Sequence, residues 1–179
     1  MTDVMNATSM EAAMSETRKQ AEARRAGERP VHLLIPVDAT DRSRWGIRYA
    51  LAQHDAGTPV RVSLLFVAVP PDEWRILRFR SEDDILRFQF ARGKLLMDDA
   101  ACGLRKAGIE VDYLERAGDI VFHILDAAEQ CACDAIVMPV PYPRLVKLLS
   151  VDVARDVIRR QRAVPVISVD EQGLAVLTG

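Results

Sequence analysis

Between residues 31 and 170, apolar segments of strand length alternate with segments of helical periodicity. Continuous apolar runs of this length are typical of strands that helices cover on both faces. They predict strands at residues 31–37, 60–69, 134–140 and 164–169. Residues 110–116 alternate between polar and apolar instead, which is typical of an outer strand. The pattern therefore predicts five strands.

Helical periodicity and capping residues predict four helices between these strands. Ser43 can cap the first, and Ser81 with Asp84 forms a capping box at the start of the second, which is the longest. The inward-facing residues predicted for this long helix are Ile85, Phe88, Ala91, Leu95 and Leu104. The predicted helices span about residues 43–54, 81–107, 119–130 and 151–162.

The strict alternation of strands and helices determines the expected fold class. Strands joined by helices run parallel, and such crossovers are right-handed, so the helices must cover both faces of one sheet. We therefore expect an α/β fold, a three-layer sandwich around a five-stranded parallel sheet. Residues 31–170 form this domain, and residues 171–179 are expected to be a short tail.

Residues 1–30 have a different composition, with few large apolar side chains, five acidic residues and five basic residues. Thr8 and Glu11 match a capping box, so a helix over residues 9–26 is predicted within an otherwise charged tail. The tail is either a solvated appendage or a helix that binds a partner protein. The sequence leaves both interpretations open.

Composition excludes several classes of protein. The chain has 179 residues, 49% of them hydrophobic, which suffices for one domain with a sizeable core. The net charge of -2 argues against a dedicated nucleic-acid-binding protein. No apolar run is long enough to span a membrane, and no secretory signal is visible. The three cysteines cannot all pair, so a reducing cytoplasm is the expected location.

Four segments, in the same order, resemble the universal stress protein family. Residues 36–43 (PVDATDRS) are similar to the family's first strand, its Val-Asp-Gly-Ser-like turn and a helix that begins at a serine. Residues 133–138 (CDAIVM) resemble its Ala-Asp-Leu-Ile-Val-Met strand. Residues 116–124, and residues 153–158 with 164–169, are similar to the segment before its fourth strand and to its last helix and strand. Together the matches cover about residues 31–170.

The resemblance implies a Rossmann-like sheet of the adenine-nucleotide alpha-hydrolase-like type, with strand order 3-2-1-4-5. Strands 1 and 4 are then neighbours, and ligands of such folds bind at the carboxyl ends of these strands. Many family members bind ATP there. Their loop after strand 4 carries Gly, two residues, Gly, nine residues, Gly and then Ser or Thr, which lets the backbone and a helix N-terminus approach the phosphates.

This chain departs from that loop pattern. The first two glycine positions hold Pro139 and Tyr142, and the last two hold Asp152 and Val153, or Val151 and Asp152 if the helix is aligned instead. A carboxylate roughly 5 Å from one phosphate charge costs about 3 kcal/mol at an effective dielectric constant of ~20. That is roughly a hundredfold in affinity. We therefore expect no bound cofactor and no ATP binding of the family's usual kind.

The opposite case also has support in the sequence. A magnesium ion held by Asp152 would reverse the sign of the electrostatic argument, and the bases Arg144 and Lys147 could meet an anion. If a nucleotide binds, the expected contacts are Asp38, Thr40, Pro139, Arg144 and Asp152. Asp38 also has a purely structural interpretation, as an Asx-type cap on the turn into the first helix.

Other clusters in the sequence favour structural roles. Cys131 and Cys133 lack the second ligand pair of a zinc site and are expected to be small buried residues. The basic and aromatic residues 74–80 are flanked by acids and are interpreted as an amphipathic flap, with a protein or nucleic-acid contact as the alternative. His32 and His54 have no Ser or Cys near them in sequence. No catalytic motif is present, and we expect no enzyme activity and no metal site.

These observations lead to one main functional expectation and two alternatives. The main one is a non-catalytic homodimer of the universal stress type, acting in stress response or regulation. Its dimer is expected to form through the apolar edge strand from Val164 to Val169. The first alternative is a nucleotide-binding switch or slow ATPase that uses the crevice between strands 1 and 4. The second is a module that recruits a protein partner through the N-terminal helix or the flap at 74–80.

Overall fold

The computed structural model describes residues 29–69, 81–142 and 152–177. Five parallel strands form one sheet in the order β3-β2-β1-β4-β5, as the resemblance implied. The elements in chain order are β1 (Val31–Pro36), α2 (Ser43–Asp55), β2 (Val60–Ala68), α4 (Glu82–Lys106), β3 (Glu110–Ala117), α5 (Ile120–Gln130), β4 (Ala135–Pro139), α6 (Val153–Arg160) and β5 (Val166–Val169). The expected helix at 9–26 and the flap at 74–80 lie outside the described residues.

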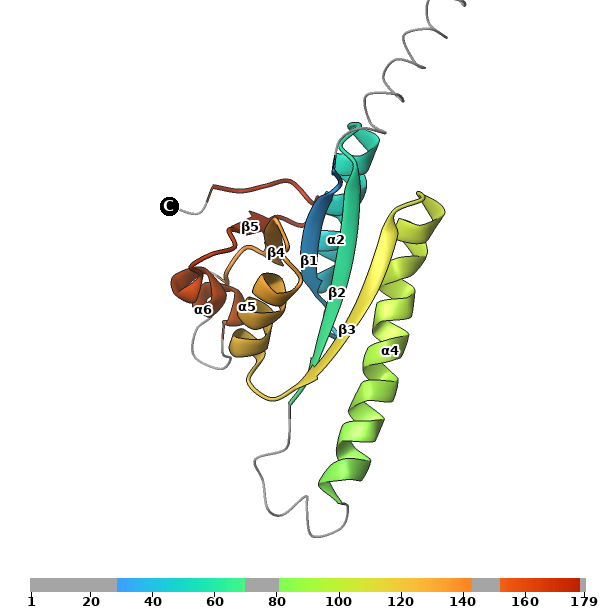
Figure 1. The fold of residues 1–179 in the computed structure, drawn as a ribbon, viewed down its shortest axis with the longest axis vertical. Coiled ribbons are helices and arrows are strands. Elements are labelled where there is room, and N and C mark those ends of the chain that lie inside the picture. Colours follow the sequence, from blue (N-terminus) through green and yellow to red (C-terminus); the bar gives the residue numbers. More distant parts are fainter. Residues whose placement is uncertain (1–28, 70–80, 143–151, 178–179) are drawn as a thin grey trace, which may run out of the picture.

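Helices cover both faces of the sheet, which confirms the three-layer α/β architecture (Figure 1). Alternate residues of β1 enter opposite cores: Leu33 and Ile35 join a cluster with α2 and α4, whereas Leu34 joins a cluster with α5 and α6. All three side chains are buried. This two-sided burial explains why the central strands read as continuous apolar runs. None of the helices in the described ranges combines the length and apolar character that crossing a membrane requires.

Side-chain caps begin three of the helices. Ser81 Oγ accepts a hydrogen bond from the backbone N–H of Asp84 at 3.2 Å, as the capping box predicted, and Asp119 accepts one from Phe122 at 2.6 Å. Asp152 caps α6 in the same way. The cap predicted for α2 is wrong: Ser43 is its first helical residue, and the N-cap position holds Arg42 without a side-chain cap. Ser43 Oγ donates instead to the Thr40 carbonyl.

The inward face predicted for α4 is also mostly wrong. Phe88, Ala91 and Leu95 are exposed, and of the residues predicted to face inward only Leu104 is fully buried. The buried stripe is built largely from small residues and comprises Gly93, Met97, Ala100, Ala101 and Leu104. Small side chains let the helix backbone approach the sheet, and the ring of Phe66 on β2 lies directly over Gly93. Periodicity of large apolar residues therefore predicts the wrong face of α4 to be buried.

A crevice opens where β1 and β4 stop pairing. The two strands pair at Leu33↔Ala135 and Leu34↔Ile136, although both continue further. In a parallel ladder of this register the next bonds would need the amide hydrogens of residues 36 and 139. Both are prolines, which have no N–H to donate. The strands' carboxyl ends are thus left free to part, which places the cavity described below at the centre of the sheet.

Two helical glycines should respond to alanine in opposite ways. An added Cβ at Gly46 on α2 would lie 2.9 Å from Ile35 Cγ2, whereas at Gly103 on α4 the nearest atom it would meet, Leu51 Cδ1, is 3.8 Å away. Overpacking costs typically ~1–3 kcal/mol, and alanine gains up to about 1 kcal/mol over glycine in a helix. We expect Gly46→Ala to lower the free energy of unfolding by about 1 kcal/mol and Gly103→Ala to raise it by about 0.5 kcal/mol. Urea denaturation measures both, and equal effects would contradict the close approach of α2 to the sheet.

Candidate functional site

A cavity of about 200 Å³ lies at the carboxyl ends of β1 and β4. Its walls are apolar and come from both sides of the switch point, and they include Leu65, Phe66, Val67, Ile120, Ile124, Met138 and Ala154. Polar side chains line it at the ends of two loops: Asp38, Thr40, Arg42 and Ser43 follow β1, and Asp152 precedes α6. Position and shape are those of a ligand site in an open α/β sheet.

The loop after β1 is held by its own side chains. Asp38 Oδ1 accepts hydrogen bonds from the backbone N–H of Thr40 at 2.8 Å and from Thr40 Oγ1 at 2.6 Å. This is the Asx-type turn that the structural interpretation of Asp38 predicted. Ser43 Oγ donates to the carbonyl of Thr40 at 2.9 Å. The side chains of Asp38, Thr40 and Ser43 are therefore partnered within the loop itself.

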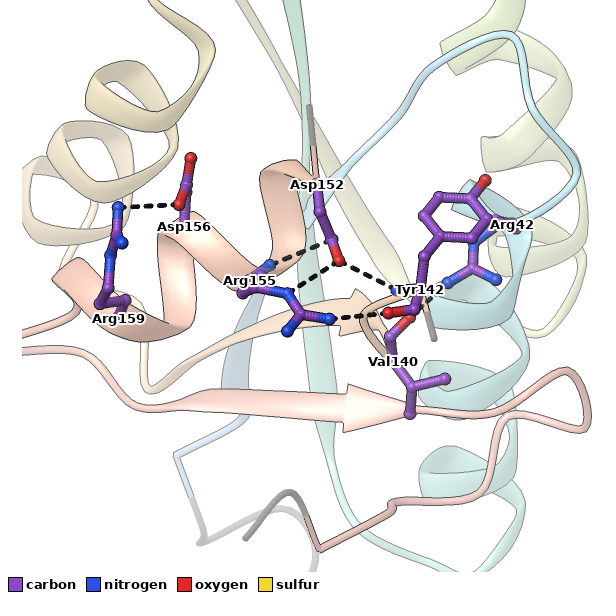
Figure 2. A network of polar contacts seen from close by, with 7 residues as sticks. All are labelled: Arg42, Val140, Tyr142, Asp152, Arg155, Asp156 and Arg159. Carbon is purple, nitrogen blue, oxygen red and sulfur yellow. Dashed lines mark hydrogen bonds and ion pairs between the residues drawn. The ribbon is translucent and has the colours of Figure 1, made fainter. Parts of the chain in front are cut away.

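Asp152, just before α6, is hydrogen-bonded to Tyr142, just after β4 (Figure 2). One carboxylate oxygen accepts the backbone N–H of Arg155 at 3.3 Å, which caps α6. The other accepts the backbone N–H of Tyr142 at 3.0 Å and Arg155 Nε at 3.2 Å. Arg155 completes the ring by donating from Nη2 to the Tyr142 carbonyl at 2.7 Å. The Asp152 side chain is only 8% exposed and that of Arg155 30%, so the carboxylate is the nearly buried member of this ion pair.

This network places a resident anion at the N-terminus of α6. Helix N-termini attract phosphates because their free N–H groups and the helix dipole favour negative charge. Here the Asp152 carboxylate already caps that terminus and is paired with Arg155. Because the ion pair is neutral overall, it repels a phosphate less than the unpaired carboxylate considered in the sequence analysis would. The obstacle is instead that the carboxylate occupies donors an incoming anion would use.

Arg42 connects the β1–α2 loop to the residues that follow β4. Its guanidinium donates to the carbonyl of Val140 and lies between two aromatic rings, with Cζ 4.0 Å from the centroid of Tyr142 and 4.5 Å from that of Trp45. Cation–π contacts at such distances stabilise a guanidinium in place. The arrangement crosses the crevice between the β1–α2 and β4–α6 loops (Figure 2).

Comparison with known proteins identifies the family to which this fold and crevice belong. The model of the universal stress protein family matches residues 31–169. The chain belongs to this family. No curated protein is significantly similar to the chain in sequence.

Solved structures of other universal stress proteins share the fold of this one. A family protein from Burkholderia pseudomallei is 18% identical, with 78% of this chain and 95% of that chain covered and a TM-score of 0.60. UspA from Lactobacillus plantarum is 17% identical, with 80% and 99% covered and a TM-score of 0.60. A family protein from Arabidopsis thaliana, solved with AMP bound, is 15% identical, with 79% and 92% covered and a TM-score of 0.56. At these identities the likeness establishes the fold alone.

The structure brings four of the five candidate contacts of this universal stress protein together. Asp38, Thr40, Pro139 and Asp152 all line the cavity. Arg144 lies outside the described residues, as does Lys147. That any of them contacts a ligand stays a prediction.

Sequence reasoning missed Arg42 and Arg155. The spacing of Asp152 and Arg155, three residues apart at a helix start, was the one signal that could have revealed the closed cap. For Arg42 only the contact with Trp45 is local, and its partners across the crevice, Val140 and Tyr142, are about a hundred residues away.

A second cluster lies at the opposite end of β1, where tertiary structure supplies partners that the sequence hid. His32 Nε2 is 2.8 Å from Ser63 Oγ and 3.8 Å from Cys133 Sγ. All three residues are buried. Burial, followed by the charge of Arg61, lowers the pKa of His32 despite opposing effects of Asp112, Asp134 and the Cys131 backbone. Burial also raises the pKa of Cys133 to about 12. A protonated, inaccessible thiol is a core group and no nucleophile.

The cysteine pair at the start of β4 fits the structural interpretation. Cys133 is buried and Cys131 half-buried, at the junction of α5 and β4. His123 is engaged elsewhere, with Nε2 3.0 Å from the Ala117 carbonyl. Within residues 29–69, 81–142 and 152–177, no three His, Cys, Asp or Glu side chains are grouped so that they could hold a metal ion.

Proposed function

We propose that this universal stress protein acts in stress response or regulation without catalysis, through protein contacts, and that its crevice does not grip ATP by a phosphate loop. The observation that carries the proposal is the Asp152 carboxylate, which caps α6 and pairs with Arg155 where a phosphate would otherwise bind. A cytoplasmic location and a partner on the N-terminal helix or the 74–80 flap remain predictions.

The proposal depends on whether the hydrogen-bond donors at the N-terminus of α6 are free to bind a phosphate. An incoming phosphate would have to displace a nearly buried carboxylate from two backbone N–H groups and a guanidinium. Hydrogen bonds to charged groups contribute about 1.5–3 kcal/mol each, and a phosphate that took these donors would leave the Asp152 carboxylate unpaired, so this exchange is unfavourable. Magnesium would likewise have to compete with Arg155 for the Asp152 oxygens. The expected result is an empty phosphate position.

Calorimetric titration with MgATP tests the proposal, using Asp152→Ser as the informative variant. Serine keeps a helix cap but removes the resident charge and frees Arg155. We expect no binding by the wild-type protein at millimolar nucleotide. For the variant we expect a dissociation constant at least about tenfold below that millimolar limit, in line with the removal of about one charge-assisted hydrogen bond. Asp156→Ser is the matched control, since Asp156 lies in the same helical turn but pairs with Arg159.

Two results would overturn the proposal. Micromolar binding of MgATP by the wild-type protein would show that the phosphate position is available. An equal gain in the Asp156→Ser control would show that general charge, and not the occupied cap, determines affinity.

A nucleotide-binding switch or slow ATPase is the second candidate, and one observation favours it. The apolar cavity remains open beside Asp38 and Thr40, and the Arabidopsis relative was solved with AMP bound. Such a ligand would use the β1 side of the crevice and dispense with the α6 terminus. Native mass spectrometry of the purified protein distinguishes the candidates: a retained nucleotide supports the switch, and a bare protein mass supports the main proposal.

A further inference from the structure

The outer side of β5 is an edge of the sheet with a defined set of polar groups. β5 is the last strand of the sheet, and its inner side pairs with β4 (Figure 1). The Val169 carbonyl accepts from the N–H of Val140, just after β4, so the backbone groups of Ile167 and Val169 face inward. Because successive residues alternate along a strand, the backbone groups of Val166 and Ser168 face outward. Exposed edges of this kind pair readily with another extended segment.

Residues 171–177, here called the C-terminal tail, turn back onto this edge. Asp170 Oδ1 accepts the N–H groups of Gln172 and Leu174, both at 2.9 Å, which closes the turn. The tail then runs antiparallel to β5. The Asp170 N–H donates to the Leu174 carbonyl at 3.0 Å, and the Val176 N–H donates to the Ser168 carbonyl at 2.8 Å. The tail therefore occupies the end of the edge, from Ser168 to Asp170, that was expected to form the homodimer.

Gly173 sets the position of the turn against α2. Its φ of +77° is one that glycine adopts easily. An added Cβ would lie 2.7 Å from both Arg48 Cβ and the backbone nitrogen of Tyr49. Arg48 also donates to the Glu171 carbonyl at 2.5 Å. The turn is thus fitted closely to the helix, and only glycine permits that fit.

The remainder of the tail is held by little besides hydrogen bonds. Leu174, Ala175, Val176 and Leu177 are exposed, so their burial contributes little to docking. Each neutral hydrogen bond contributes only about 0.5–1.5 kcal/mol net. A tail with few such bonds and little apolar burial is docked reversibly.

The edge beneath the tail is self-complementary. If the β5 strand of a second copy lies antiparallel with the two-fold axis at Ile167, Val166 of each copy faces Ser168 of the other. Each of these residues has an outward N–H and an outward carbonyl, so four reciprocal backbone bonds can form. Pairing would also cover the half-buried Val166 and Ile167. It requires Ser168 to release Val176, and Val166 to release Gln161 Oε1, to which its N–H donates at 2.7 Å.

We infer that the C-terminal tail is a releasable cover that competes with a second copy of this chain for the outer edge of β5. With the tail docked the chain is monomeric through this edge, and with the tail displaced two β5 strands pair. The competition is independent of what the crevice binds. Because both copies must release their tails, the apparent dimer dissociation constant is multiplied by (1 + K)², where K is the tail's docking constant. A K of about 10 gives roughly a hundredfold.

Sedimentation over a concentration series tests the inference with two variants. One chain ends after Asp170, and the other carries Gly173→Val, which would clash with Arg48 and Tyr49. Both are expected to dimerise at roughly a hundredfold lower concentration than the wild-type chain. Unchanged circular dichroism identifies folded variants, and the point variant covers the case in which truncation prevents folding. Leu177→Ser is the control, since Leu177 is fully exposed and should leave dimerisation unchanged.

Three outcomes would overturn the inference. Equal dimer dissociation constants for all chains would show that the tail does not compete. Folded variants that stay monomeric at every concentration would show that the edge does not fit a second copy. Weaker dimerisation on loss of the tail, or in Leu177→Ser, would show that the tail forms the dimer interface and does not cover it.

Discussion

Replacing Arg155 with alanine should lower the free energy of unfolding by about 2–3 kcal/mol. The substitution leaves the Asp152 carboxylate, which is 8% exposed, without its guanidinium partner and removes the donor to the Tyr142 carbonyl. Loss of one member of a buried ion pair costs about 3–5 kcal/mol. Arg155 is itself partly exposed, so solvent screening reduces that figure here. Urea denaturation of both proteins provides the measurement.

The same helix supplies a matched control. Arg159 pairs with Asp156 at the same spacing, but its side chain is 71% exposed (Figure 2). Exposed pairs contribute about 0–1 kcal/mol, so Arg159→Ala should cost less than about 1 kcal/mol. Adding Asp152→Asn to Arg155→Ala should recover part of the loss, because the unpaired charge is gone. Equal losses for Arg155→Ala and Arg159→Ala would contradict the buried character of the Asp152 pair.

Replacing Ile124 with alanine should lower the free energy of unfolding by about 3 kcal/mol. Ile124 is fully buried on α5 in the core cluster with Leu65, Ile136 and Val157, and it also lines the crevice. Truncating a buried isoleucine to alanine costs about 2–5 kcal/mol through lost burial and the cavity left behind. The space would join the existing cavity, so little of it can be closed by collapse. Thermal and urea denaturation would both register the change.

Phe122, two residues earlier on α5, provides the comparison. Its side chain is largely exposed, and its backbone N–H is engaged by the Asp119 cap, which an alanine would keep. Phe122→Ala should therefore cost less than about 1 kcal/mol, as surface substitutions usually do. A loss at Phe122 as large as that at Ile124 would mean that α5 presents a different face to the sheet.

The elements of the fold were predictable because their signals are local. Apolar runs, the alternation at residues 110–116 and helical periodicity located the five strands and four helices of the described residues, with ends that differ from the observed ones by a few residues. The order 3-2-1-4-5 came from the family resemblance and is confirmed. The face of α4 was not predictable in this way, because Gly93 and Ala100 pack closely through the absence of a large side chain.

The candidate site was predictable only in outline. Asp38, Thr40, Pro139 and Asp152 were assigned to one crevice, and they line one cavity. The sequence could not show that Asp152 is neutralised, since that depends on how Arg155 folds back onto the Tyr142 loop. His32 is also far from Ser63 and Cys133 in the sequence. Only strand pairing and the α5–β4 junction bring the three side chains together.

By itself, the sequence determined the parallel α/β sandwich and the loss of glycines after the fourth strand, because both depend on residue types at fixed spacings along the chain. Only the tertiary structure decided the state of the α6 terminus and the pairing of β5 with its own tail. Each of those depends on a hydrogen-bond partner chosen from several that the chain could offer, and the choice is made by packing of segments that the linear order does not place together.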